Sequence, residues 1–462
     1  MTRRTLGRFI CASGLILAGA CAVCHAGGSR AGNEPGLNVV LICLNALRAD
    51  HLKAYGYGTE TAPNISGLAG EAAVFEAAVA QSHWTLPSLA SLFTSKYVHS
   101  HGLYERGGKL SEHEVTLAEM LKARGYLTAA FTGGLDMSGA YGLKQGFDVY
   151  FDDTGNKPMG SFERIMPRAL NWLTARKDDR FFLFVDSYDI HPPFDKPEPG
   201  PKASEYAGAL KGLVLDYNRL KDFKNGALLL NGREVKLSKA DLDYIVSRYD
   251  AGIAYADRFV GGLLAKLEEL ELSGNTVIIL TSEHGEELAD HGSFDRFGRK
   301  NLYEESIRVP LIIKNPRINS KGARISAQAQ LIDVMPTVLD MLAVPVNKEA
   351  QGASLVPLME GGKTEKDFNR CVYSEASFHK WAVRAGQWKL IYESGKYELF
   401  NLADDRAEIG NLAEKNPAVV YGLAQELMRW RRKTRTDKSP DDTRVTVTEE
   451  MKRKLKEAGY WR

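Results

Sequence analysis

The chain has 462 residues, of which 44% are hydrophobic and 26% are charged. These values are ordinary for a globular protein and exclude a disordered or collagen-like chain. The 60 lysines and arginines nearly balance 58 aspartates and glutamates, so no basic excess points to a nucleic-acid partner. The length accommodates one large domain and a smaller second one.

The first 26 residues have the features of an export signal. Arg3, Arg4 and Arg8 precede an apolar stretch over 9–23, and small residues surround Ala26. A basic region, an apolar region and a small-residue cleavage site define a signal peptide, and the apolar stretch is shorter than a membrane span of roughly 20 residues. We therefore expect a signal peptide at 1–26 and a periplasmic or secreted protein.

Two alternatives stay open for this segment, and they concern the export route and a lipid anchor. Residues 2–6 resemble a twin-arginine signal as well as a simple basic region. Residues 18–21 resemble a lipoprotein cleavage site, in which case Cys21 carries lipid and tethers the protein to a membrane. Cys43 and Cys371 follow the expected cleavage point, and we expect buried free thiols there rather than a disulfide.

Short apolar runs alternate with amphipathic helical stretches through most of the chain. Runs at 37–44, 127–132, 181–185, 276–281 and 309–313 are nearly continuous and rich in β-branched or aromatic residues, which is typical of strands covered on both faces. Helices are expected at 62–70, 117–124, 162–175 and 249–270. This alternation predicts an α/β fold with a large, mostly parallel central sheet and helices on both faces.

Two regions depart from this alternation. The proline-rich segment at 194–239, with turns at Asn225-Gly226 and Asn231-Gly232, predicts a surface insertion that is partly hairpin. Beyond 365, short strands separated by turns and a helix at 417–431 predict a small antiparallel sheet with one helix. A charged tail at 432–448 precedes a last helix at 449–457. We expect a large domain at 35–365 and a C-terminal subdomain with its tail at 366–462.

Polar side chains follow three of the predicted strands where each strand ends: Asn45 after the first, Asp186, Asp189 and His191 after the third, and Glu283 and His284 after the fourth. The carboxyl ends of parallel strands meet at one edge of a sheet, where ligands bind in open α/β folds. Oxygen and imidazole donors gathered there suit a divalent metal ion.

Residues 83–94 lead from a polar turn directly into a predicted helix. A helix N-terminus offers free N–H groups and a positive dipole end to an anion. Thr85 at this point is either a metal-activated nucleophile or an N-cap with Pro87 in the first turn. The local sequence alone favours the cap.

Ordered motifs run along nearly the whole chain, at 38–51, 55–57, 62–65, 84–94, 146–148, 282–292 and 302–310, with further segments between 383 and 412. Together they resemble the sulfatase family of the alkaline phosphatase superfamily. The resemblance implies that 35–365 is a catalytic domain and that the chain is a hydrolase or phosphotransferase acting on an anionic sulfate or phosphate ester. It also implies one divalent metal ion, which we expect to be Ca²⁺, Mn²⁺ or Zn²⁺.

The resemblance also assigns roles to individual residues. The metal ligands would be Asn45, Glu283, His284 and the hydroxyl of Thr85, which would also be the nucleophile. His191 and Lys300 match the ester-binding histidine and the anion-binding lysine of the family, so both would act in catalysis and in substrate binding. Arg48 would contact the anion or brace its loop.

Several positions depart from the family pattern, including 132–134, where the family's usual lysine is absent. Asn45 and Ala46 replace metal-binding aspartates, Leu89 replaces an arginine, Glu283 replaces an aspartate, and Thr85 replaces the cysteine or serine that becomes formylglycine. Threonine is not expected to yield that aldehyde, so we expect no formylglycine. Threonine nucleophiles occur in the same superfamily, in nucleotide phosphodiesterases and lipid-headgroup phosphotransferases. Thr85 therefore favours phosphoester chemistry.

Two other functions remain open. One is a conventional sulfuric ester hydrolase, and the other is a catalytically degenerate family member that binds anionic glycans or lipids. The expected partner is an anionic ester on a glycan, a lipid headgroup or a small molecule. No nucleic acid is expected, and a membrane is expected only if Cys21 is lipidated.

Overall fold

The computed structural model describes residues 36–152, 154, 155, 157, 159–197, 206–220, 223–230, 232–294, 301–362, 368, 370–434 and 449–457. The expected signal peptide at 1–26, its Cys21 and the predicted anion-binding residue Lys300 lie outside these described residues.

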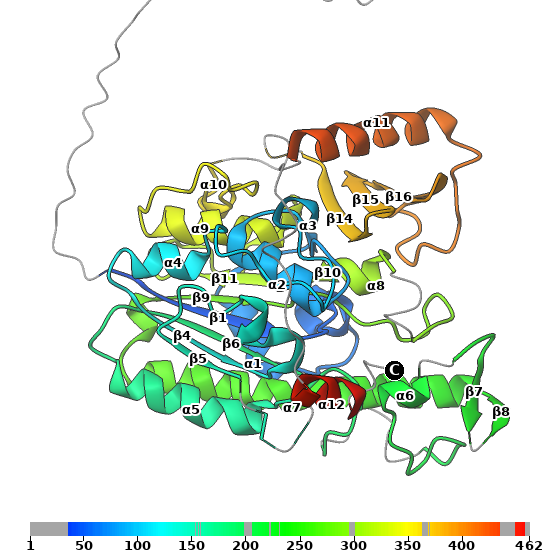
Figure 1. Cartoon of the computed structure of the whole chain (residues 1–462), viewed down its shortest axis with the longest axis horizontal. Helices are drawn as coiled ribbons and strands as arrows, with labels where there is room; N and C mark the ends of the chain where they lie inside the picture. The colour runs from blue at the N-terminus through cyan, green and yellow to red at the C-terminus, as the bar shows by residue number, and fades with distance from the viewer. Residues whose placement is uncertain are drawn as a thin grey trace, which may run out of the picture. The chain divides into compact units, whose positions relative to one another are not determined.

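An eight-stranded sheet forms the centre of the fold, with the strand order β12-β2-β11-β9-β1-β6-β4-β5. Strands β11, β9, β1, β6, β4 and β5 are labelled in Figure 1. Five neighbouring strands are parallel: β9 (Thr276–Thr281), β1 (Asn38–Leu44), β6 (Phe181–Ser187), β4 (Leu127–Thr132) and β5 (Val149–Phe151). On the other side of β9, the antiparallel β11 (Leu311–Lys314) is followed by the mutually parallel pair β2 (Ala73–Phe75) and β12 (Arg324–Ile325). The predicted mostly parallel α/β sheet is confirmed.

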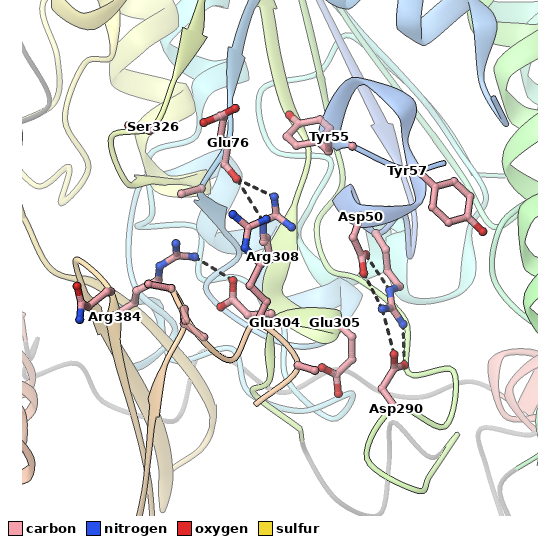
Figure 2. Close-up of a pocket in the computed structure, with 18 of the residues that line it drawn as sticks. Asp50, Tyr55, Tyr57, Glu76, Asp290, Glu304, Glu305, Arg308, Ser326 and Arg384 are labelled. Atoms are coloured by element: carbon pink, nitrogen blue, oxygen red, sulfur yellow. Dashed lines mark hydrogen bonds and ion pairs between the residues drawn. The ribbon is translucent and has the colours of Figure 1, made fainter. Parts of the chain in front are cut away.

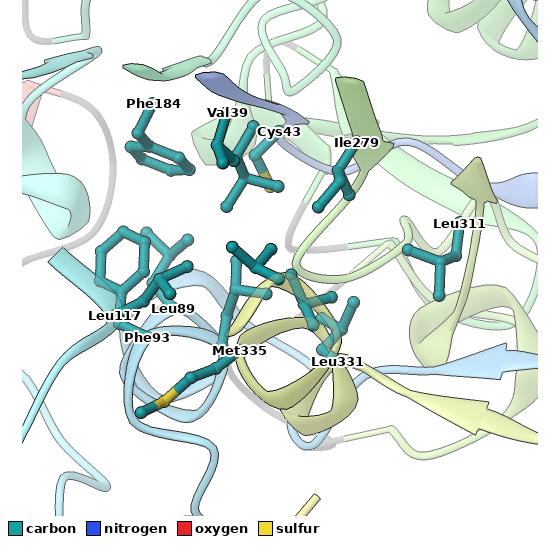
Figure 3. Close-up of a cluster of buried hydrophobic side chains, with 14 of the residues drawn as sticks. Val39, Cys43, Leu89, Phe93, Leu117, Phe184, Ile279, Leu311, Leu331 and Met335 are labelled. Carbon is teal, nitrogen blue, oxygen red and sulfur yellow. The ribbon is translucent and has the colours of Figure 1, made fainter. Parts of the chain in front are cut away.

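Helices cover both faces of this sheet, because each face is apolar. One face packs against α2 (Thr85–Thr94), α4 (Leu117–Lys122), α9 (Val334–Met341) and α10 (Val356–Met359). The other packs against α1 (Pro63–Gly70), α5 (Phe162–Ala175) and α7 (Lys239–Glu269). Figure 3 shows the first core, where Val39 and Cys43 of β1 and Phe184 of β6 face Leu89 and Phe93 of α2.

Most predicted boundaries agree with the structure to within three residues, and two elements differ more substantially. Helix α7 begins at Lys239 rather than at 249, because Ser238 and Asp241 form a capping box that satisfies two of the first amides. The apolar run at 309–313 divides at Pro310, which has no amide hydrogen to donate. The residues before it form β10 (Arg308–Val309) in a small sheet with β3 (Ala78–Val79) and β13 (Ala329–Gln330).

The predicted insertion carries a short helix, α6 (Tyr217–Leu220), and a hairpin of β7 (Ala227–Leu230) and β8 (Arg233–Lys236). Single helical turns elsewhere are α3 (Val98–His101), α8 (Glu304–Ile307) and the 3-10 turns Ala49–His51, Lys53–Tyr55, Leu135–Met137, Gly139–Tyr141, Ser273–Asn275 and Leu331–Asp333. None of the helices in the described part of the chain has both the length and the apolar composition needed to cross a bilayer.

The C-terminal part of the chain forms an antiparallel sheet of β14 (Val372–Ser377), β15 (Lys380–Ala385), β16 (Trp388–Glu393) and β17 (Lys396–Asn401). The division into two domains at 365 stays a prediction. Helix α11 (Pro417–Thr434) buries Leu427 and Trp430 against Val383 and Leu390 of this sheet. The predicted small sheet with one helix is confirmed. The last helix, α12, spans Glu449–Glu457.

Candidate active site

Three neighbouring strands bring polar side chains together at the carboxyl edge of the sheet. In the parallel register, Cys43 of β1 lies opposite Asp186 of β6 on one side and Thr281 of β9 on the other. Side chains alternate between faces along a strand, so Cys43 and Asp186 both belong to the face that α2 covers. Glu283 follows two residues after Thr281. The convergence expected from the strand ends is therefore present.

Thr85 is the first residue of α2, and Trp84 is the N-cap. The interpretation of Thr85 as an N-cap is therefore wrong. Its Oγ1 accepts a hydrogen bond from Nδ2 of Asn45 at 3.0 Å and lies 3.2 Å from Nε2 of His284. The helix begins one residue earlier than it would with Thr85 as the cap, and the hydroxyl of Thr85 contacts residues that follow β1 and β9.

His284 has a defined tautomer in this arrangement. Its Nδ1 lies 2.6 Å from the carbonyl oxygen of Gly285, which can only accept a hydrogen bond. Nδ1 therefore carries the proton, and Nε2 presents its lone pair to the hydroxyl of Thr85. This is the geometry of a general base beside a nucleophile.

Asn45 connects Thr85 to Glu283. Its Nδ2 donates to Oε1 of Glu283 as well as to Thr85, while its Oδ1 is buried without a hydrogen-bond partner. Ala46 follows with a φ of 66°, a left-handed conformation that alanine disfavours, and it offers no ligand atom. The neutral side chain of Asn45 thus lies between Thr85 and Glu283. A carboxylate at this position would instead need a cation beside it.

Cys43 and Asp186 are part of this site, although the ligand set expected from the family resemblance includes neither. One donor atom from each of Cys43, Asp186 and Glu283 lies within 4.8 Å of the other two, and all three residues are fully buried. The thiol of Cys43 donates to Oε2 of Glu283 at 3.2 Å. Only the register between β1 and β6 brings Cys43 to Asp186, so no local sequence signal marks the pair.

Burial dominates the electrostatics of this group. Burial raises the pKa of Asp186 well above its usual range, and the negative charge of Glu283 raises it further. Burial also raises the pKa of the Cys43 thiol, with the charges of Asp186 and Glu283 adding to the shift. Without a cation among them, these groups favour their protonated forms.

The donor set fits a divalent cation. Oδ1 of Asn45 is buried without a hydrogen-bond partner. The buried carboxylate of Asp186 faces the backbone amides of Asn45 and Ser187 and the thiol of Cys43, none of which carries a positive charge. Leaving a buried polar atom without a partner costs about 1–3 kcal/mol, and more for a charged group. A cation among these atoms would remove that cost, and thiolate, carboxylate and amide oxygens are all metal donors.

His191 and Arg48 lie on loops at the same edge of the sheet. Nδ1 of the buried His191 lies 3.0 Å from the carbonyl oxygen of Pro192, which fixes Nδ1 as the protonated nitrogen. Arg48 is held between Asp50, at 2.8 Å, and Asp290, at 2.7 Å (Figure 2). Arg48 thus braces the loop after β1 against the loop after β9. The binding of an ester by either residue stays a prediction.

A cavity of about 700 Å³ lies beside this brace and reaches the C-terminal part of the chain. It is lined by charges of both signs, and many of them pair with one another, such as Arg384 with Glu304 at 2.9 Å (Figure 2). Among the described residues, Thr85 and Glu283 do not line it. The cavity and the candidate nucleophile are therefore separate features of the same edge.

The sequence and fold have clear relatives. A sequence model of the sulfatase family matches residues 37–344, and a model of the C-terminal region of N-sulphoglucosamine sulphohydrolase matches 289–433. The chain is 26% identical to arylsulfatase K of the dog, Canis lupus familiaris, over 461 residues that cover 87% of this chain and 84% of that protein.

Two solved structures share the fold. One is a complex with its substrate D-glucosamine-2-N,6-O-disulfate, which superposes with a TM-score of 0.71 at 22% identity and covers 88% of this chain and 99% of that one. The other is the phosphonate monoester hydrolase of Agrobacterium radiobacter, with a TM-score of 0.70 at 21% identity, covering 90% and 98%.

Proposed function

The chain belongs to the sulfatase family of ester hydrolases, and on that premise we propose that it is an exported, metal-dependent phosphoester hydrolase or transferase with Thr85 as its nucleophile. The observation that carries the proposal is the hydroxyl of Thr85, which lies at the start of α2 between Nε2 of His284 and the amide of Asn45. Sulfatase-family enzymes generally use a divalent metal ion. When bound, such an ion partly neutralises the negative charge of the ester and of the attacking oxygen.

Each residue of the site would have its own role in the reaction. Oγ1 of Thr85 attacks the phosphorus while its proton moves to Nε2 of His284, and the alcohol of the ester leaves. A water molecule then hydrolyses the phosphothreonine, or an acceptor alcohol takes up the phosphoryl group. The N-terminal amides of α2 face the ester oxygens, as helix N-termini do with anions. His191 and Lys300 would bind the ester and assist its leaving group.

The ion would be held by Glu283 and by Oδ1 of Asn45, next to the hydroxyl of Thr85. Nε2 of His284 would bind the ion only when it does not contact the hydroxyl of Thr85. Oδ1 of Asn45 is buried without a hydrogen-bond partner, which supports this assignment. Because Asn45 is neutral and Ala46 offers no donor, Ca²⁺ would bind weakly at these residues alone.

Threonine at position 85 supports a phosphorus centre over a sulfur centre. A hydroxyl with a β-methyl group cannot become the aldehyde that sulfatases use, but it can form a phosphothreonine. The shared fold with a phosphonate monoester hydrolase supports a site that accommodates phosphorus esters. Glycans, lipid headgroups and small molecules remain the candidate carriers of the ester.

The test compares 4-nitrophenyl phosphate, bis(4-nitrophenyl) phosphate, a phosphonate monoester and 4-nitrophenyl sulfate, with Mn²⁺, Zn²⁺ or Ca²⁺ added in turn. Thr85→Val removes the hydroxyl and keeps the shape. Thr94→Val is the matched control, because Thr94 is buried in the same helix and its hydroxyl only contacts the carbonyl of Ala90. We expect phosphoester turnover that is lost in Thr85→Val alone. Turnover of the sulfate only would instead support a conventional sulfuric ester hydrolase.

A second candidate is a binding protein for anionic glycans or lipids. The closed position of the site favours it, because Thr85 is only 1% exposed and Glu283 is fully buried. In that case none of the esters would be hydrolysed with any metal, and a sulfated or phosphorylated ligand would bind saturably without turnover.

A further inference from the structure

Cys43, Asp186 and Glu283 form a mixed thiol and carboxylate cluster beneath the start of α2. Each residue comes from a different strand or strand end, and the three donor atoms lie within 4.8 Å of one another. In tetrahedral zinc sites, S and O ligands at about 2.3 Å and 2.0 Å lie roughly 3.5 Å apart. The 3.2 Å between Sγ of Cys43 and Oε2 of Glu283 is close to that spacing.

Asp186 provides an independent indication of a ligand. Its side chain is fully buried, and it interacts with the backbone amides of Asn45 and Ser187 and with the thiol of Cys43, none of which carries a positive charge. No salt bridge joins it to another residue in the described ranges, although the carboxylate of Glu283 lies within the same cluster. A buried carboxylate beside a second one is stable only with a cation or a proton.

The arrangement also resolves a conflict over His284. Nε2 of His284 cannot ligate a metal and accept the proton of Thr85 at the same time, and it faces Thr85 at 3.2 Å. Cys43 and Asp186 supply the anionic ligands that Asn45 and Ala46 do not. Three protein ligands would leave room for one further donor, as in catalytic zinc sites.

We propose that Cys43, Asp186 and Glu283 are the ligands of a Zn²⁺ ion. The metal site of this chain then lies at the strand pair β1–β6 rather than at Asn45 and Ala46, and it selects zinc over calcium. This inference rests on the proposed function for its catalytic meaning. Thiolate is a soft ligand that zinc binds well, whereas Ca²⁺ requires six to eight oxygen ligands. Binding deprotonates the Cys43 thiol and Asp186 and releases both protons to solvent.

The test titrates Co²⁺ into the metal-free mature protein and follows the absorption spectrum. A cobalt–thiolate bond gives a charge-transfer band in the near ultraviolet, and tetrahedral Co²⁺ absorbs strongly in the visible. We expect both features, together with their loss when Zn²⁺ is added and their persistence when Ca²⁺ is added.

Two variants and one control locate the ligands. Cys43→Ser should abolish the charge-transfer band, and Asp186→Asn should weaken Co²⁺ binding at least about tenfold. Cys371→Ser is the control, because Cys371 is the other free cysteine of the described chain and lies in its C-terminal part. It should leave the spectrum unchanged. X-ray absorption of the unmodified zinc-loaded protein should show one sulfur neighbour at about 2.3 Å, which removes any dependence on how the variants fold.

Co²⁺ binding without a charge-transfer band, zinc without a sulfur neighbour, or no metal binding at all would overturn the proposal. The two proposals fail separately. Thr85-dependent phosphoester turnover without a metal–sulfur bond contradicts the zinc site alone. A metal–sulfur bond in a protein that hydrolyses none of the esters supports the zinc site and contradicts the proposed function alone.

Discussion

Oγ1 of Thr85 lies 3.2 Å from Nε2 of His284, although 199 positions separate the two residues in the chain. Thr85 is the first residue of α2, and His284 follows the last residue of β9 by three positions. The carbonyl of Gly285 holds the other nitrogen of His284 as a donor, so the imidazole can accept a proton only from the side of Thr85.

His284→Gln should therefore lower kcat by about 10²- to 10⁴-fold, the usual contribution of a general base, with a smaller change in KM. The glutamine can keep a hydrogen bond to Thr85 but cannot take its proton. The measurement is kcat and KM for the best phosphoester across a pH series. His379→Gln is the control, because His379 is exposed. Equal losses in both variants would contradict a specific role for His284.

Asn45→Asp should make the stability of the protein depend more strongly on Mn²⁺ or Ca²⁺ than that of the wild type. Nδ2 of Asn45 donates to both Glu283 and Thr85, and an aspartate would replace these donors with a negative charge beside Glu283. Without metal, we expect a loss of about 2 kcal/mol in the free energy of unfolding. Added Mn²⁺ or Ca²⁺ should restore it, because a cation between the two carboxylates offsets their repulsion.

Thermal denaturation with a chelator and with each metal measures this effect. Asn38→Asp is the matched control, since Asn38 is buried at the other end of the same strand, where its Oδ1 accepts from the amide of Phe181. A metal response of equal size in both variants would show that the effect is not local to the site.

The sequence predicted where the site lies but not all of the residues that form it. Runs of apolar residues identify the strands, and polar residues such as Asn45 and Glu283 mark where the strands end. Cys43 lies inside an apolar run, so its burial was predictable. Its contact with Asp186 depends on the register between two strands that are distant in sequence, which a single sequence does not encode locally.

Arg48→Lys should lower stability more than it changes substrate binding. The guanidinium contacts Asp50 and Asp290 at once, and an ammonium group cannot reproduce this fork. We expect a loss of about 1–2 kcal/mol in the free energy of unfolding and a KM within about twofold of the wild type. Arg106→Lys is the comparison, because Arg106 makes a similar fork on Asp136. A large rise in KM with unchanged stability would instead make Arg48 a ligand of the ester.

His291 should give the protein a pH-dependent contribution to stability. Its ring stacks on Tyr303, and Nδ1 lies 2.8 Å from Oε1 of Glu305. Burial by itself lowers the pKa of His291, but the hydrogen bond and charge of Glu305, with a smaller contribution from Glu408, outweigh it and raise the pKa to about 9. A raised pKa stabilises the folded protein fully below the unfolded value of about 6.5, and this stabilisation disappears as the pH rises through 9.

His291→Gln should consequently lose more stability at pH 6 than at pH 10, by a difference of about 1–2 kcal/mol. Denaturant unfolding of both proteins at the two pH values measures this difference. The neighbouring Glu287 also titrates in this range, because burial and the charge of Glu305 raise its pKa to about 8. Comparing the variant with the wild type at the same pH largely cancels this contribution. His379→Gln is the control, because His379 is exposed. A loss that is equal at both pH values would mean that the ring packing against Tyr303, and not the charge of His291, stabilises this loop.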